Sequence, residues 1–363
     1  MYANISGEVK DSMTVIVEEN KDLKPNKLKA LMELLKKVGL DGFIIALLGM
    51  IFLAYLWPRG GIQNGHFSLA LVANYGVSLI FFFYGLRLNP EKLREGLSNW
   101  RLHVVVHITT FIVFPLLVLS CKLMFDKNNH DLIWLGAFYL ATLPSTVSSS
   151  VVMVSIAKGN LPAAIFNASI SSLIGVFITP LWMGLFLSTA GNNFQLWNVI
   201  GKLMLQVLLP VIMGILLHSR LGSLAEKHRK GLRYFDQSII LLIVYTSFCQ
   251  SFAKQMFNGY STWHLLEIGI SMAILFFLVF TLISITSRLL NFNREDRITA
   301  VFCGSKKSLV HGTVMSKVLF PGSNIVGIVL LPVMMYHALQ LVAASIIAQS
   351  MAKKQKTSYT NTH

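Results

Sequence analysis

Two polar, helix-breaking stretches interrupt long apolar runs, and their side chains are the ones in this chain that could bind a ligand. The first is Tyr-Leu-Ala-Thr-Leu-Pro-Ser-Thr-Val-Ser-Ser-Ser, residues 139–150, where a proline removes a helical N–H and hydroxyls surround it. The second is Thr-Ala-Val-Phe-Cys-Gly-Ser-Lys-Lys-Ser, residues 299–308, which holds two adjacent lysines. Inside a bilayer, non-helical backbone is tolerated only where protein or a water-filled cavity covers it. Both stretches are therefore candidate binding sites.

The first stretch offers hydroxyl oxygens and carbonyls freed by the proline. Such hard oxygen ligands suit an alkali cation, and they equally suit hydrogen bonds to a substrate. Small residues also let membrane helices pack closely, so packing is the alternative for each residue taken singly. Their concentration beside a proline favours a site. The candidate substrate- or ion-binding residues here are Pro144, Ser145, Thr146, Ser148, Ser149 and Ser150.

The second stretch places two cations in an apolar run. A charge at the bilayer centre costs about 2.5–3.5 kcal/mol on insertion scales, so buried ionisable residues usually face a cavity. The alternative is a span that begins after the lysines, but the apolar residues 298–304 would then form an unexplained loop. We expect one of Lys306 and Lys307 to face a cavity, and the other to pair with a carboxylate or snorkel to the interface. Ser305 and Ser308 flank the pair and complete this candidate site.

Three further polar residues lie in neighbouring apolar runs and are candidates for the same site. Asn167 and Ser172 follow the first stretch, and a helix–helix hydrogen bond is the alternative role for Asn167. His337 follows the second stretch, where it could titrate near neutral pH or serve as an interhelical donor. The runs hold no midspan carboxylate, and the chain has no P-loop, HExxH or GxSxG motif. We therefore expect no enzyme and no cofactor.

The composition is that of a membrane protein. Of the 363 residues, 54% are hydrophobic and only 13% are charged, and the mean hydropathy is +0.62. A soluble domain carries about a quarter charged residues. The pattern predicts an all-α polytopic membrane protein whose ten transmembrane helices lie near 40–57, 68–86, 102–122, 132–157, 161–187, 196–218, 235–253, 265–287, 298–319 and 324–348.

The net charge of +15 lies between these spans and forms no continuous stripe for nucleic acid. With ten spans, 23 of the 31 Lys and Arg residues fall on one side and five on the other, which predicts that both termini are cytoplasmic. We expect residues 1–38 to form a cytoplasmic segment with a short amphipathic helix from about Asn26, residues 39–349 a transporter domain, and residues 350–363 a basic cytoplasmic tail.

The transporter domain divides into halves, 39–190 and 191–349, of five spans each. Because five is odd, the halves have opposite orientations, as in the inverted repeats of many secondary transporters. The interrupted span is the fourth in each half. This correspondence predicts a secondary transporter with its site where the two interrupted helices meet.

The residues at these breaks resemble the bile acid:sodium symporter family. The runs Leu143-Pro144 to Ser149-Ser150-Val151, Ala157-Lys158-Gly159-Asn160 and Thr179-Pro180-Leu181 are similar to its fourth and fifth spans. Gly304-Ser305-Lys306-Lys307-Ser308 resembles the ninth span of a divergent branch with bacterial symporter-like proteins and the seventh vertebrate member. The resemblance covers roughly 40–348. It implies that the fourth and ninth helices cross in a core of spans 3–5 and 8–10, which moves against a panel of spans 1, 2, 6 and 7.

The same resemblance reveals a departure at the sodium ligands. Where sodium-coupled members carry a Glu and a Gln in the ninth span, this chain has Phe302 and Lys306, and the Ser-Asn pair of the fourth span is Ser149-Ser150. An ammonium there repels a second cation by about 4 kcal/mol at 4 Å and an effective dielectric of 20. Ser149 and Ser150 are the candidate sodium ligands that the resemblance implies, and the ammonium disfavours the two-sodium coupling of those members. We expect a lysine to act as a built-in cation that holds the crossing or meets an anion.

The expected function is transport of a small organic anion or an ion by alternating access in a bacterial-type inner membrane, with sodium or a proton as the coupling ion. Since burial disfavours the charged form of a lysine, proton coupling through Lys306 or Lys307 is one alternative. The others are a cation/proton antiporter and a membrane regulator that no longer transports. The substrate and the oligomeric state stay open at this level.

Overall fold

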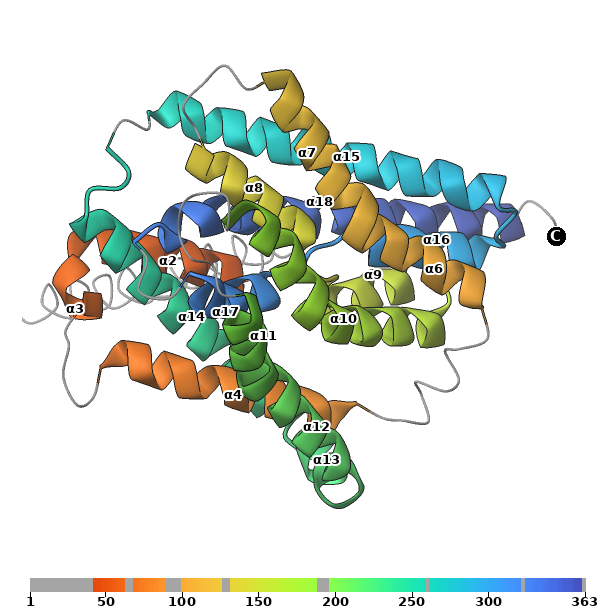
Figure 1. Cartoon of the computed structure of the whole chain (residues 1–363). Coiled ribbons are helices and arrows are strands. Elements are labelled where there is room, and N and C mark those ends of the chain that lie inside the picture. The colour runs from red at the N-terminus through yellow and green to blue at the C-terminus, as the bar shows by residue number, and fades with distance from the viewer. Residues whose placement is uncertain are drawn as a thin grey trace, which may run out of the picture.

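The computed structural model describes residues 42–62, 68–88, 99–125, 131–187, 196–258, 261–320 and 324–360, which form helices with no strand among them (Figure 1). The amphipathic helix predicted from Asn26 lies outside these residues. In chain order the helices are α2 (Gly42–Leu56), α3 (Pro58–Ile62), α4 (Leu69–Arg87), α6 (Trp100–Ile108), η2 (Thr109–Val113), α7 (Phe114–Phe125), α8 (Asp131–Thr142), α9 (Ser148–Ile156), α10 (Leu161–Leu187), α11 (Leu196–Leu203), η3 (Met204–Leu208), α12 (Leu209–Leu216), α13 (His218–Lys227), α14 (Arg229–Ala253), α15 (Thr262–Leu289), α16 (Arg294–Gly304), α17 (Leu309–Leu319) and α18 (Val326–Thr360).

Several of these helices are long and apolar enough to cross a membrane. Four qualify by length and composition, and a fifth is added if the bent pair of residues 201–216 and 218–227 counts as one span. The four are Trp100–Lys122, Leu161–Leu185, Thr262–Leu289 and Val326–Ala352. Each of the ten ranges predicted to span contains at least one helix, and α18 continues well beyond the predicted end at residue 348. The fold is thus that of an all-helical membrane protein.

Both predicted interruptions are confirmed. Helix α8 ends at Thr142 and α9 begins at Ser148, so the proline stretch is non-helical. Helix α16 ends at Gly304 and α17 begins at Leu309, which leaves the two lysines in the gap. The Ser308 side chain caps α17 by accepting the His311 N–H. Each half of the chain therefore contains one broken helix pair.

Two prolines widen helices elsewhere. The π-helical segments η2 and η3 lie just before Pro115 and Pro210. A proline donates no N–H, and a π turn shifts the hydrogen-bond pattern around such a residue. The segment η2 becomes important at the site, because one of its carbonyls is left without a helical donor.

The helices pack most extensively within two groups. In one group, α4 lies against α12 and α14, and α14 also packs on α2 and α3. In the other, α18 lies against α8 and α15, and α16 packs on α6 and α15; Figure 1 shows α15 and α18 running alongside each other. The broken pairs α8–α9 and α16–α17 belong to the second group, so that group positions the candidate site.

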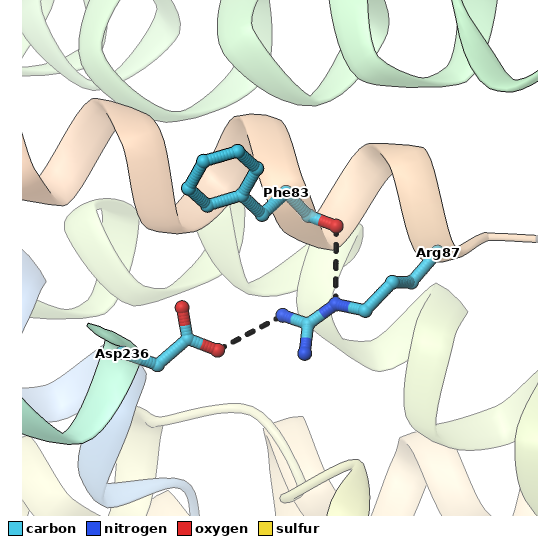
Figure 2. A network of polar contacts seen from close by, with 3 residues as sticks. All are labelled: Phe83, Arg87 and Asp236. Atoms are coloured by element: carbon cyan, nitrogen blue, oxygen red, sulfur yellow. Dashed lines mark hydrogen bonds and ion pairs between the residues drawn. The ribbon is translucent and has the colours of Figure 1, made fainter. Parts of the chain in front are cut away.

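An ion pair fastens the first group. The Arg87 guanidinium at the end of α4 lies 2.9 Å from the Asp236 carboxylate on α14 (Figure 2). The Arg87 Nε also donates to the Phe83 carbonyl one turn earlier, at 3.1 Å, which orients the guanidinium. Both charged side chains are mostly shielded, so their attraction is screened less than at an open surface.

Candidate functional site

The two broken helices are bonded directly to each other at their gaps. The Ser308 N–H donates to the Pro144 carbonyl at 2.9 Å. The Ser145 hydroxyl donates to the Cys303 carbonyl at 2.6 Å, close to the end of α16. Both pairs join residues far apart in the chain, and Ser145 is fully buried. The structure thus brings together the two stretches that the sequence singled out.

Lys307 is a buried cation whose hydrogen-bonding capacity is fully used. Its Nζ donates to three backbone carbonyl oxygens, those of Thr110 at 2.7 Å, Ala141 at 2.6 Å and Leu143 at 2.8 Å. The same nitrogen lies 4.2 Å from the centre of the Phe114 ring, within cation–π range. An ammonium has three donors, so none is left over. The expectation that the second lysine pairs with a carboxylate or snorkels is therefore wrong for Lys307.

The Thr110 carbonyl is available because of the proline that follows η2. The Phe114 N–H reaches back to the Thr109 carbonyl in the π pattern. In the same pattern the Thr110 carbonyl would accept from residue 115, which is a proline and has no N–H. Lys307 supplies the missing donor.

The other two acceptors lie at the C-terminal end of α8, where helical carbonyls have no partner within the helix. The Ser145 N–H, which could have reached Ala141 one turn back, donates instead to the Ser171 hydroxyl at 2.9 Å. The intervening Thr142 carbonyl accepts from the Thr179 hydroxyl at 2.8 Å. A cation at a helix C-terminus also complements the helix dipole. Lys307 therefore acts as a cap for α8.

The carbonyls beyond the end of α16 are satisfied from α18. The Tyr336 hydroxyl donates to the Ser305 carbonyl at 2.6 Å. The Gln340 side chain forms a pair of bonds with the backbone of Lys307, accepting its N–H and donating to its carbonyl, both at 2.8 Å. The Ser305 hydroxyl donates to the Val301 carbonyl one turn earlier in the chain, at 2.7 Å. The backbone around the lysines is thus held rigidly.

The Lys306 ammonium group, unlike that of Lys307, forms no hydrogen bond with the described residues. Its side chain is fully buried, yet its Nζ has no hydrogen-bond partner among the described residues. It lies within electrostatic range of the Cys303 thiol and the His337 ring. A buried ammonium without a partner is strongly disfavoured. Lys306 is therefore the charged side chain at the two gaps whose polar atom no described residue engages.

The hydroxyls of the first stretch divide into used and unused groups. The Ser150 hydroxyl is fully buried and has no partner within the described part of the chain. Ser149 is half-buried, and its contact with the Thr146 hydroxyl is long, at 3.5 Å. The start of α9, at Ser148, carries no side-chain cap. Unlike Ser145, Ser149 and Ser150 keep polar capacity available near the break, whereas the Ser148 side chain lies outside the described part of the structure.

The more distant candidates are mostly engaged in packing contacts. The Asn167 Oδ1 lies 3.1 Å from the His103 Nδ1 and so forms a hydrogen bond between α10 and α6, the alternative considered for this residue. The Ser172 hydroxyl bonds a carbonyl one turn earlier in its own helix, at 3.0 Å. The His337 Nδ1 accepts from Gln340 at 3.0 Å. His337 also lies in electrostatic range of Lys306.

His311 is a further polar side chain at the two gaps, and the sequence patterns above do not include it. His311, in the first turn of α17, pairs through Nδ1 with the Ser308 hydroxyl at 2.9 Å. Its ring meets the Phe81 ring of α4 edge-on, and its Nε2 has no partner among the residues described. The signal was present in the spacing, because a residue three positions after an N-cap serine lies beside the serine hydroxyl. This histidine links the crossing to the first packing group.

Comparisons with known proteins agree with this architecture. The model of the SBF-like CPA transporter family matches residues 41–353. The protein PA2026 of Pseudomonas aeruginosa is 39% identical over 315 residues, which cover 87% of this chain and 94% of that protein. YfeH of Escherichia coli K12, whose name proposes a symporter, is 36% identical over 310 residues, 85% of this chain and 92% of its own. Sodium/bile acid cotransporter 7 of Rattus norvegicus is 27% identical over 333 residues, 90% of this chain and 97% of its own.

These matches confirm the resemblance seen at the two breaks. They extend over nearly the whole described structure, and the family and its named members are transporters rather than enzymes. Together with the apolar helices, they identify an integral membrane protein of a transporter family. The chain belongs to the SBF-like CPA transporter family.

Proposed function

We propose that the chain is a secondary active transporter that moves a small organic anion by alternating access, with Lys306 as the cation that meets the substrate. The observation that carries the proposal is the contrast between two adjacent buried lysines. Lys307 is bonded to three carbonyls, whereas Lys306 has no partner in the described structure. An anion that pairs with Lys306 would offset the unfavourable free energy of burying its ammonium group without a counter-charge.

The contacts of the Lys307 ammonium group indicate which ion could drive transport. Three carbonyl oxygens at 2.6–2.8 Å form the kind of hard oxygen cluster that an alkali cation would otherwise use. The chain fills this cluster with its own ammonium, so a sodium ion near Ser149 and Ser150 would meet a fixed positive charge. We infer coupling to protons in place of the two-sodium scheme. Lys306, when neutral, offers a lone pair that can accept the coupling proton.

The proposed machinery follows the two packing groups. The group with α2, α4, α12 and α14 is the panel, and the group with the two broken pairs is the core that moves against it. We propose ten spans in two inverted repeats, 39–190 and 191–349, with residues 1–38 and 350–363 in the cytoplasm and the protein in a bacterial-type inner membrane. The equivalent positions of the breaks support the repeat, and the distribution of Lys and Arg supports the orientation.

The test is uptake into proteoliposomes that contain the purified full chain. Radiolabelled carboxylates, sulfonates and phosphate esters are offered under an imposed proton gradient, and separately under a sodium gradient. We expect accumulation of one anion class under the proton gradient. Lys306→Met should abolish it, and Lys306→Arg should retain part of it, because the arginine keeps the charge but not the reversible proton.

Lys202 provides the matched control, since it is an exposed lysine on α11. Lys202→Met should leave uptake unchanged. Sodium-driven uptake that persists in Lys306→Met would overturn the proposal. Flux of cations against protons, with no anion moved, would establish instead the cation/proton antiporter, which the unpartnered Lys306 would also serve.

A further inference from the structure

Residues 218–234 form a corner at one end of the molecule, away from the broken helices. Helix α12 ends at Leu216, and the helix that follows turns away from it by 97°. Figure 1 shows α13 at the edge of the molecule, beyond α4 and α12. Residues 201–216 are apolar and meet the criteria for a membrane span only together with residues 218–227. With residues 201–216 across the bilayer, a helix almost at a right angle to them lies along the bilayer surface.

The exposed side chains around the corner locate that surface. Leu216, the last residue of α12, is 73% exposed, as expected of a side chain that faces lipid. Tyr234, in the second turn of α14, is 69% exposed, and aromatic residues of this kind concentrate at the level of the lipid headgroups. Helix α13 lies between these two residues in the chain. This order along the chain, together with the bend at residue 217, favours a position of α13 at headgroup level.

One face of α13 is fastened to the protein. The His218 Nδ1 bonds the Leu86 carbonyl at the end of α4, at 2.7 Å. Gly222 and Ala225, on the same face, are buried. A Cβ on Gly222 would come within 2.8 Å of the His218 ring, so the glycine permits this close packing. The helix is thus held in one orientation, and its other face is fixed outward.

The outward face combines apolar and basic side chains. Leu221 and Leu224 are exposed there, three residues apart on one side of the helix. Exposed basic residues surround them, and the only carboxylate between 218 and 234 is Glu226, which bonds Arg229 at 3.3 Å. The basic residues of the corner are Arg220, Lys227, Arg229, Lys230 and Arg233.

We propose that this corner binds the headgroups of anionic phospholipids. Leu221 and Leu224 enter the boundary of the acyl chains, and the basic side chains contact the lipid phosphates. Apolar residues at this depth beside several cations are the combination that attracts an amphipathic helix to an anionic surface. Each Lys or Arg at such a surface strengthens the attraction by roughly fivefold. The proposal concerns the panel side and is independent of the substrate.

The test uses a fluorophore on the corner itself. Ser223 is exposed between the two leucines, so a bimane attached to Ser223→Cys, in a chain with the exposed Cys121 changed to serine, reports the adjacent lipid. The full chain is reconstituted in vesicles that contain phosphatidylglycerol and phosphatidylcholine, one of them brominated as a quencher. We expect brominated phosphatidylglycerol to quench more strongly than brominated phosphatidylcholine at equal mole fraction, and salt to reduce the difference.

The variants separate a lipid site from general surface charge. Neutralising the corner with Arg220→Gln, Lys227→Gln and Lys230→Gln should weaken the preference for phosphatidylglycerol by about tenfold or more. Neutralising Arg59 and Lys254, which are exposed but lie elsewhere in the chain, should leave it unchanged. Equal quenching by both lipids in the native chain, or a preference that survives the triple variant, would overturn the proposal. So would loss of the preference on adding inorganic phosphate at constant ionic strength.

Discussion

Exchanging each of the two buried lysines for methionine should affect the stability of the protein differently, although the two residues are neighbours. Lys307→Met keeps the length of the side chain and removes its three donors. The carbonyls of Thr110, Ala141 and Leu143 then lose their partner inside the protein. Lys306→Met removes a buried amine that has no partner in the described structure. The first change should destabilise the protein and the second should not.

The magnitude follows from the contacts of Lys307. Three unmet buried acceptors cost about 1–3 kcal/mol each, and the lost contact with the Phe114 ring adds about 2 kcal/mol. Removal of the ammonium recovers its desolvation penalty, which is several kcal/mol. We expect a net destabilisation of about 3 kcal/mol for Lys307→Met. For Lys306→Met the recovered desolvation has no lost hydrogen bond to offset it, so the protein should be unchanged or more stable.

The assay is thermal unfolding of the purified chain in detergent, followed by tryptophan fluorescence. With an unfolding entropy of about 2 cal/mol/K per residue, a loss of 3 kcal/mol lowers the Tm by roughly 4 °C. Lys202→Met, at an exposed lysine, controls for the loss of a cation as such. A Tm for Lys307→Met equal to that of the native protein, or equal decreases for both buried lysines, would refute the reasoning.

Two further predictions concern the panel. Gly85→Ala should destabilise the protein by about 1–3 kcal/mol in the same assay, because the new Cβ would lie 2.2 Å from the Val211 carbonyl oxygen. Gly201→Ala is the control: its Cβ would have no atom within 4 Å, so the change should be neutral or slightly stabilising. Equal effects of the two substitutions would contradict this packing argument. Asp236→Asn should cost about 1–2 kcal/mol by leaving the Arg87 guanidinium without its carboxylate. In a double-mutant cycle with Arg87→Gln, the combined loss should be smaller than the sum, and strict additivity would show that the two groups do not interact.

The interruptions of both broken helices could be predicted because their causes are local. A proline at 144 and the polar, glycine-containing stretch from 304 cannot continue an apolar helix, whatever surrounds them. The non-helical gaps, residues 143–147 and 305–308, lie inside the predicted stretches 139–150 and 299–308. The corner at α13 is different, because the sequence indicates only that its basic residues lie between predicted spans. Helix α13 turns by 97° from the helix before it and packs against α4, and the residues of α13 do not by themselves predict this contact.

The roles of the two lysines show where local information ends. Lys306 and Lys307 have the same chemistry and nearly the same burial, so no property of the pair itself distinguishes them. The distinction comes from backbone carbonyls 164 to 197 positions away in the chain. Every residue has a backbone carbonyl, so the side-chain types in the sequence do not indicate which carbonyls will bind the lysine. These three carbonyls come together only when η2 and the end of α8 pack around Lys307. The apolar runs, the proline at 144 and the two midspan lysines are enough to predict a helical membrane protein with two broken helices and buried cations. Which of the two lysines is hydrogen-bonded and which has no partner among the described residues depends on the tertiary packing, because the unsatisfied ends of distant helices meet at only one of them.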